Sequence, residues 1–186
     1  IKSTFEFFSN EKIENIFIGD SVVLGAHSSK LFKLNYEIIA VSGATIDCSK
    51  IILGYLNKFE PKNIIIYLGG NDSDGESNYD SNKATELFKK FVEHIEKINT
   101  VSKIYIIGIN KGLPSRRNIK YVENLNKNIK KLENGTKVFY IESFDELNFE
   151  KKDFNSLSYD GEHLKYLGYK KWFSYLSKHI PNLIEK

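Results

Sequence analysis

Short apolar runs alternate along this chain with stretches in which apolar residues recur every three or four positions. Five runs lack polar alternation and are rich in Ile, Val, Tyr and Phe: Asn15–Gly19, Tyr36–Val41, Asn63–Leu68, Lys103–Gly108 and Lys137–Ile141. Continuous apolar runs of this length are typical of strands that are buried on both faces of a parallel sheet. We therefore predict five parallel strands.

Helical periodicity separates these runs. We expect five helices, over Ser21–Phe32, Thr45–Phe59, Asn82–Ile98, Ile119–Leu132 and Leu164–His179. Alternating strands and helices, joined by right-handed crossovers, place helices on both faces of one sheet. The predicted fold class is α/β: a three-layer α/β/α sandwich around a flavodoxin-like, doubly wound five-stranded parallel sheet of order 2-1-3-4-5. Residues 1–14 are expected to form a lead-in segment, and residues 15–186 a single domain.

The first three predicted strands are each followed by a residue suited to catalysis. Ser21 follows the first strand, Gly43 the second and Asn71 the third. In open α/β sheets, ligands bind outside the carboxyl ends of the strands, where the strand order reverses. Because strands one, two and three are neighbours in the expected order, Ser21, Gly43 and Asn71 should meet at one place.

These three residue types suit acyl transfer. Ser21 opens a predicted helix, so its N–H lies at the positive end of the helix dipole. Glycine at position 43 lets a backbone N–H approach a substrate oxygen closely. The amide of Asn71 adds a further donor, and three donors beside a serine hydroxyl can form an oxyanion hole.

A serine nucleophile needs a base, and four histidines could supply it. Three of them are expected on helices and away from the strand ends: His27, His94 and His179. His163 differs because Asp160 precedes it by three residues, just ahead of the last predicted helix. A carboxylate at this spacing can orient the imidazole and stabilise its protonated form.

Four short motifs, taken together, resemble those of the SGNH/GDSL hydrolases in type and order. They are Gly-Asp-Ser at 19–21, Ser-Gly-Ala-Thr at 42–45, Gly-Gly-Asn-Asp at 69–72 and Asp-Gly-Glu-His-Leu at 160–164. The resemblance spans about residues 15–176 and implies an esterase mechanism without a metal or a cofactor. It also implies that the four residues for which the family is named are Ser21, Gly43, Asn71 and His163.

We therefore predict a serine esterase acting on short-chain, acetyl esters. Ser21 is the expected nucleophile, His163 the base and Asp160 the residue that orients the base. The N–H groups of Ser21 and Gly43 and the amide of Asn71 are expected to hold the oxyanion. Two alternatives use the same fold: an acyltransferase with the same site, and an inactive carbohydrate-binding or scaffold domain.

A third alternative belongs to another enzyme class. Asp20, Asp72 and Asp74 all follow strand ends, and clustered carboxylates can hold Mg²⁺ for phosphoryl chemistry. No glycine-rich phosphate loop with a following lysine is present, however, and this alternative leaves Asp160 and His163 unexplained. Asp20 and Asp72 are instead expected to brace the loops.

Two polar loops, Asp72–Ser81 and Asn110–Asn118, flank the expected site. Their hydrogen-bonding and aromatic residues are Asp74, Glu76, Asn78, Tyr79, Asp80, Arg116 and Arg117. A long acyl chain needs a contiguous apolar surface, because each buried methylene contributes about 0.8 kcal/mol. The polar loops therefore favour an acetyl ester of a polar alcohol, such as a sugar of a glycan or glycoconjugate.

Composition narrows the possible partners and compartments. The 186 residues carry a net charge of +3 without an arginine-rich run, so no nucleic-acid partner is expected. No apolar run approaches the ~20 residues of a membrane span. The single cysteine, Cys48, is expected to be a buried hydrophobe and leaves the cytoplasm and the periplasm open. Because the chain lacks methionine, even at position 1, we expect it to begin downstream of its translation start.

Overall fold

The computed structural model describes residues 13–29, 31, 35–73, 80–113, 115–144, 147, 154–181 and 183. Residues 1–12 of the expected lead-in segment lie outside these ranges. The sheet contains β1 (Asn15–Gly19), β2 (Tyr36–Ala40), β3 (Asn63–Tyr67), β4 (Lys103–Ile107) and β5 (Val138–Ile141). All pairings are parallel, in the order β2-β1-β3-β4-β5, so the predicted fold class and strand order are confirmed.

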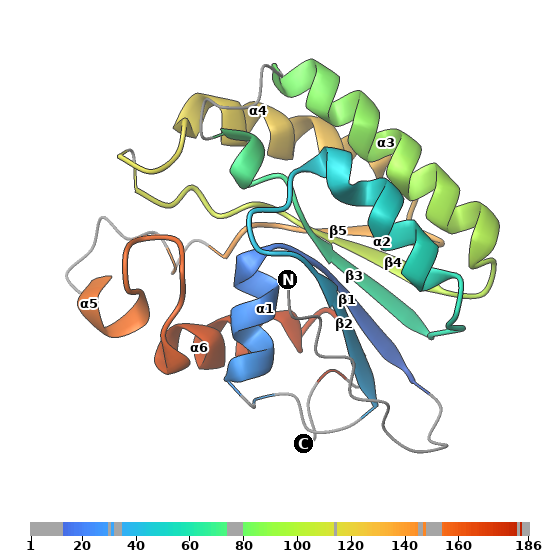
Figure 1. The fold of residues 1–186 in the computed structure, drawn as a ribbon, viewed down its shortest axis with the longest axis horizontal. Coiled ribbons are helices and arrows are strands. Elements are labelled where there is room, and N and C mark those ends of the chain that lie inside the picture. Colours follow the sequence, from blue (N-terminus) through green and yellow to red (C-terminus); the bar gives the residue numbers. More distant parts are fainter. Residues whose placement is uncertain are drawn as a thin grey trace.

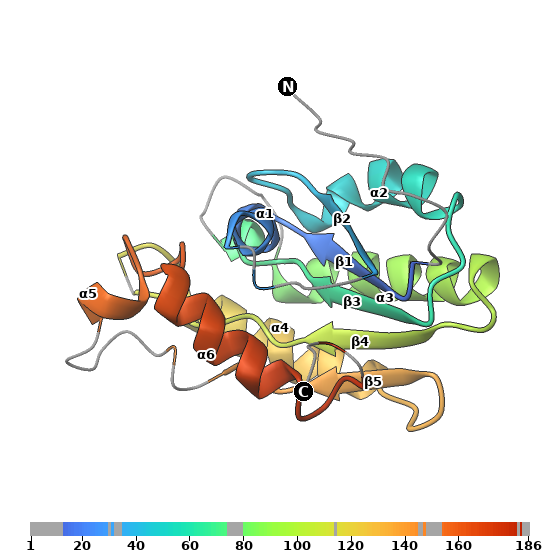
Figure 2. The ribbon, with the colours of Figure 1, turned by 90° about the horizontal axis from the view of Figure 1, so that it is seen from below.

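Helices cover both faces of the sheet. They are α1 (Ser21–Ser28), α2 (Ser49–Leu56), α3 (Ser81–Ile98), α4 (Ile119–Ile129), α5 (Phe154–Leu157) and α6 (Tyr166–Leu176). Three short 3₁₀ helices add η1 (Ile46–Cys48), η2 (Asn71–Ser73) and η3 (Lys130–Leu132). Helices α2, α3 and α4 lie on one face and α1 and α6 on the other (Figures 1 and 2).

Several predicted helices are shorter in the structure. α1 ends at Ser28, where the Ser29 hydroxyl donates to the Ala26 carbonyl at 2.6 Å and so competes with helix continuation. The second predicted helix begins as the 3₁₀ helix η1 rather than as an α-helix. The last one starts at Tyr166 because Leu164 is held in a bridge with Ser158, and α5 was not predicted.

The core is formed by the strands and the apolar faces of the helices. The isoleucines of β1 and β3 are fully buried, and a side chain of this size contributes about 1.5–3 kcal/mol when it leaves water. Trp172 of α6 is also buried and lies edge-on to Tyr67 of β3, with ring centroids 5.3 Å apart. Cys48 is only partly buried at the margin of this core, less than predicted.

The register brings three strand ends to one edge of the sheet. Gly19, the last residue of β1, lies opposite Ala40 of β2 and Tyr67 of β3. The segments that follow these residues therefore begin side by side. Among the helices that the structure describes, none is long and apolar enough to cross a membrane.

The N-terminus of α6 packs closely against the end of α5. Gly168 of α6 lies so near to Leu157 that a Cβ atom on Gly168 would be 2.2 Å from the Leu157 carbonyl oxygen. The Lys165 N–H donates to the same oxygen at 2.8 Å. This contact fixes the two ends of the loop 158–165, which joins α5 to α6.

We predict that Gly168→Ala destabilises the protein by about 1–3 kcal/mol, because the new methyl group must push α6 away from a backbone atom. Gly54→Ala is the matched control, since Gly54 is also helical and a Cβ there would have no neighbour within 4 Å. That control should stabilise the protein by about 0.5–1 kcal/mol through helix propensity. Urea unfolding of both variants checks the prediction, which an equal gain in stability for both would contradict.

Candidate active site

Ser21 is the first residue of α1 and stands at the carboxyl end of β1, which lies between β2 and β3 in the sheet. The preceding Asp20 caps this helix: its Oδ1 atom accepts a hydrogen bond from the Val22 N–H at 2.9 Å. The cap fixes the path of the backbone between β1 and α1. The Ser21 hydroxyl is thereby presented at the strand-end edge of the sheet, half-buried.

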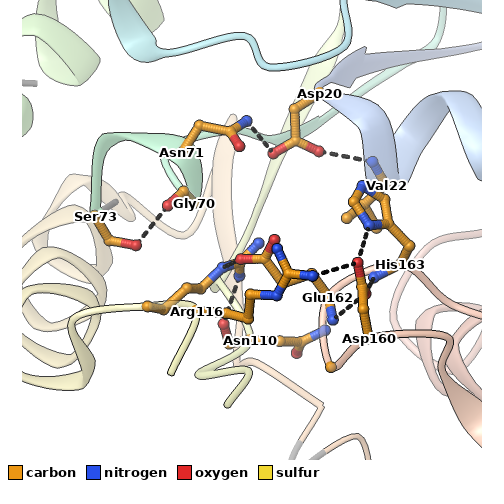
Figure 3. Close-up of polar contacts among 12 residues, drawn as sticks. Asp20, Val22, Gly70, Asn71, Ser73, Asn110, Arg116, Asp160, Glu162 and His163 are labelled. Atoms are coloured by element: carbon orange, nitrogen blue, oxygen red, sulfur yellow. Dashed lines mark hydrogen bonds and ion pairs between the residues drawn. The ribbon is translucent and has the colours of Figure 1, made fainter. Parts of the chain in front are cut away.

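Asp160 and His163 lie in a tight loop between α5 and α6. The Oδ1 atom of Asp160 accepts from the N–H groups of Glu162 and His163, at 3.0 and 2.9 Å. Ser158, which is buried, donates from its hydroxyl to the His163 carbonyl at 2.8 Å and accepts from the Gly161 N–H at 2.8 Å. These bonds hold the loop in one conformation, with the side chains of Asp160 and His163 adjacent (Figure 3).

The structure brings Ser21, His163 and Asp160 into one hydrogen-bonded line. His163 Nδ1 lies 2.8 Å from Asp160 Oδ2, and His163 Nε2 lies 3.0 Å from Ser21 Oγ. Ser21 and His163 are 142 residues apart in sequence, so tertiary folding creates this contact. A hydroxyl, an imidazole and a carboxylate in this order can activate the hydroxyl as a nucleophile.

The carboxyl group of Asp160 favours its ionised form. Partial burial opposes ionisation, but hydrogen bonds from the backbone and ring of His163 and from the Glu162 N–H outweigh it and lower the pKa of Asp160 to about 2. The exposed Arg116 guanidinium also approaches Asp160 Oδ2, at 3.6 Å. A permanently negative Asp160 is the state that can hold His163 through its Nδ1–H.

Gly43 and Asn71 lie on the segments that follow β2 and β3. Gly43 is exposed and has a φ of +72°, a conformation that favours glycine. The amide nitrogen of Asn71 donates to the Ala44 carbonyl at 2.9 Å and approaches Asp20 Oδ2 at 3.3 Å. Asn71 therefore bridges the segments that follow β1 and β2.

The two other carboxylates of this region accept hydrogen bonds from backbone N–H groups. Asp72 is buried, and both of its oxygens accept from the Ile46 N–H, at 3.1 and 3.3 Å. Burial raises the pKa of Asp72, and likewise that of Asp20, to about 6, despite the hydrogen bonds that each accepts. Asp74, the third carboxylate considered for Mg²⁺, lies outside the described residues. Within the described ranges, no group of three or more His, Cys, Asp or Glu side chains is arranged to hold a metal ion.

The remaining histidines lie away from Ser21. His27 is exposed and pairs with the Tyr36 hydroxyl at 3.3 Å, and His94 is exposed on α3. His179 was predicted in the last turn of the final helix, but α6 ends at Leu176 and His179 lies in the turn that follows. The ring of His179 instead lies edge-on to Tyr175, with centroids 5.0 Å apart.

Two residues near the site were missed or misinterpreted from the sequence. Ser158 gave no signal beyond its place in a polar stretch. Arg117 was predicted to face a substrate from a polar loop, but its side chain is only 3% exposed. It is buried because Glu162 provides a carboxylate partner for its Nε at 2.7 Å. Of the first polar loop, Asp74, Glu76, Asn78 and Tyr79 lie outside the described residues.

Comparison with known proteins identifies a matching family. Residues 17–171 match the sequence model of the GDSL-like lipase/acylhydrolase family. No curated protein has a significantly similar sequence.

Solved structures share the fold at low sequence identity. A GDSL-like lipase from Bacteroides thetaiotaomicron VPI-5482 has a TM-score of 0.70 and 18% identity, over 89% of this chain and 86% of that one. A lipase/acylhydrolase from Enterococcus faecalis has a TM-score of 0.65 and 16% identity, over 92% and 97%. A variant of an acetyl-xylooligosaccharide esterase from Geobacillus Stearmophilus has a TM-score of 0.66 and 15% identity, over 95% and 100%.

The raised pKa of Asp20 predicts how stability depends on pH. The folded state binds this proton more tightly than the unfolded state, whose aspartates titrate near 4. The resulting stabilisation is complete below pH 4 and is lost as the pH rises through about 6. Asp20→Asn removes the titration, so the variant should escape a loss on the order of 3 kcal/mol between pH 4 and 7.

Urea unfolding of wild type and Asp20→Asn across this pH range measures the effect. Ser21→Ala changes the neighbouring residue without removing a carboxylate and is the matched control. The slopes of the free energy of unfolding against pH are compared, rather than its absolute values, because the lost contact with Asn71 destabilises Asp20→Asn at every pH. Parallel pH profiles for wild type and Asp20→Asn would contradict the prediction.

Proposed function

The chain belongs to the GDSL-like lipase/acylhydrolase family and is an ester-bond hydrolase, and on this premise we propose that Ser21, His163 and Asp160 are its catalytic triad. The observation that carries the proposal is the 3.0 Å distance between Ser21 Oγ and His163 Nε2. The 2.8 Å contact between His163 Nδ1 and Asp160 Oδ2 supports the same roles. No other described histidine lies within hydrogen-bonding distance of Ser21.

In the first step, Ser21 Oγ attacks the ester carbonyl carbon while its proton moves to His163 Nε2. Asp160 accepts from His163 Nδ1–H and stabilises the imidazolium that forms. His163 then passes the proton to the leaving alcohol, and the acyl group stays on Ser21. Water attacks the acyl-enzyme in the second step, with His163 as the base again, and releases the carboxylic acid.

The oxyanion would be held by three donors from three strand-end segments: the N–H groups of Ser21 and Gly43 and the amide of Asn71. The N–H of Ser21 is at the N-terminus of α1, where the helix dipole favours negative charge. The amide of Asn71 already donates one hydrogen to the Ala44 carbonyl, at 2.9 Å. Its longer contact, 3.3 Å to Asp20, is the one that it would exchange for the oxyanion.

For the substrate, we propose a short acyl group, most simply acetyl, on a polar alcohol such as a sugar. Arg116 reaches Asp160 from the second polar loop, with its side chain 53% exposed. Tyr159, next to Asp160, is 72% exposed, and the Lys165 ammonium lies 5.3 Å from its ring centroid. The exposed ring can stack on a sugar ring, while the neighbouring lysine binds hydroxyl groups. The structurally similar acetyl-xylooligosaccharide esterase supports this choice.

Apolar side chains are also exposed on α1, after β2 and at the start of α6, which favours the rival substrate, a longer acyl chain. Leu24 of α1 is 36% exposed, and Val41, two residues before Gly43, is 43% exposed. Tyr166 and Leu167 at the start of α6 are exposed as well. If these side chains formed one contiguous surface, it would bind successive methylenes, so chain length is the variable to test.

We predict that the protein hydrolyses p-nitrophenyl acetate and that serine-directed organophosphates label it once, at Ser21. Ser21→Ala and His163→Ala should each lower kcat by at least about 10³-fold, because neither step proceeds without nucleophile and base. His27→Ala is the matched control and should keep wild-type turnover. Peptide mapping of the adduct to another serine, such as Ser42 or Ser73, would refute the assignment.

We further predict that kcat/KM is highest for the acetate in a chain-length series of p-nitrophenyl esters and has fallen by the octanoate. If each added methylene were instead buried against an apolar surface of the enzyme, it would raise kcat/KM up to about fourfold. A profile that climbs steadily to the octanoate would mean that the exposed apolar residues bind the acyl chain. The carbohydrate proposal would then be withdrawn.

A further inference from the structure

One buried arginine contacts three loops at the carboxyl edge of the sheet. The Nε atom of Arg117 donates to Glu162 Oε1 at 2.7 Å, and its Nη1 atom donates to the Asn110 carbonyl at 2.7 Å. The same guanidinium covers Gly70: a Cβ atom there would lie 2.7 Å from Arg117 Nη2. Arg117 thus links the segment after β3, the segment after β4 and the loop between α5 and α6.

Burial makes this pair different from the other ion pairs among the described residues. The side chains of Arg117 and Glu162 are 3% and 11% exposed, whereas those of Lys111 and Glu123 are 42% and 52% exposed. Taking two charges out of water opposes folding, and apolar side chains of the same size often stabilise a protein at least as well. Stability alone is therefore a poor explanation for a buried pair here, whereas fixing one geometry is a use that such pairs can have.

Glu162 sits where it can transmit that geometry. It lies between Asp160 and His163, and its N–H donates to Asp160 Oδ1 at 3.0 Å. The bonds from Ser158 shape the loop internally but do not tie it to the sheet edge that presents Ser21. The bond from Arg117 does, because Arg117 is anchored on the Asn110 carbonyl after β4.

We propose that Arg117 and Glu162 are positioning residues that set the distance between His163 and Ser21. By packing on Gly70, Arg117 also fixes the backbone next to Asn71, so one guanidinium aligns the base and the amide donor with respect to each other. Neither residue needs to touch the substrate. The proposal rests on the catalytic roles given above to Ser21 and His163.

The test replaces the pair while keeping the interior filled. In Arg117→Met/Glu162→Leu, two apolar side chains occupy the space, neither position carries a charge, and the net charge is unchanged. This variant should unfold within a few degrees of wild type, yet its kcat for p-nitrophenyl acetate should fall about 10- to 100-fold with KM within about twofold, because alignment is lost. Glu162→Gln keeps an acceptor for Arg117 and should retain more activity than Glu162→Ala. Glu123→Gln is the control for losing an exposed pair and should keep wild-type kcat.

A second measurement does not depend on turnover. The proton between His163 Nδ1 and Asp160 Oδ2 should give a downfield proton NMR resonance in wild type, and this resonance should broaden or shift in the double variant and in Glu162→Ala. A folded double variant with wild-type kcat and an unchanged resonance would overturn the proposal. If the wild-type protein hydrolysed no ester while the resonance responded as expected, the assigned function would fail and the positioning role would stand.

Discussion

The parallel register of β1 with both of its neighbours is the constraint on which the rest of the site depends. Backbone hydrogen bonds hold Gly19 level with Ala40 and Tyr67, so three chain segments leave the sheet at one edge. A slip of a single residue would turn each side chain of the strand to the other face and bury the wrong set. The isoleucine runs are apolar on both faces, so they do not by themselves make a slip costly. A slip is costly because helices cover both faces of the sheet and pack against particular side chains.

Polar groups beneath the site are buried, and their loss of contact with water opposes folding. Asp20, Asp72 and Arg117 are all buried, although they lie at a sheet edge that has to stay open to a substrate. Each is compensated by a specific partner: the Val22 N–H, the Ile46 N–H and the Glu162 carboxylate. The Ile46 and Glu162 partners come from segments distant in sequence, so for Asp72 and Arg117 the same bonds both compensate the charge and position a loop. Loss of one partner would leave a desolvated charge and a displaced loop together.

The family accounts for the type of chemistry, and the details of this chain account for its arrangement. An ester hydrolase of this family needs a nucleophile, a base and donors at the strand ends. The loops of this chain add three features: the Arg117–Glu162 pair, the hydrogen bonds that Ser158 makes within its loop, and the exposed ring of Tyr159. Substrate choice and the precision of the active-site geometry are therefore to be sought in the segments that follow β4 and β5 rather than in the sheet.

Local patterns in the sequence were sufficient for the strands and for the placement of Ser21, Gly43 and Asn71 at strand ends, whereas the strand order was predicted from the fold class. Asp160 and His163 could be paired from sequence because they lie only three positions apart in one turn. The helix ends were less predictable, since the shift to Tyr166 depends on a bridge between Leu164 and Ser158. The prediction for Arg117 was wrong, because a residue of a polar loop is expected to be exposed unless its partner is known, and Glu162 is 45 residues away. Sequence thus determined what depends on neighbours along the chain, and tertiary structure decided which charges are buried, because the free energy of a buried charge is set by partners that only folding brings near.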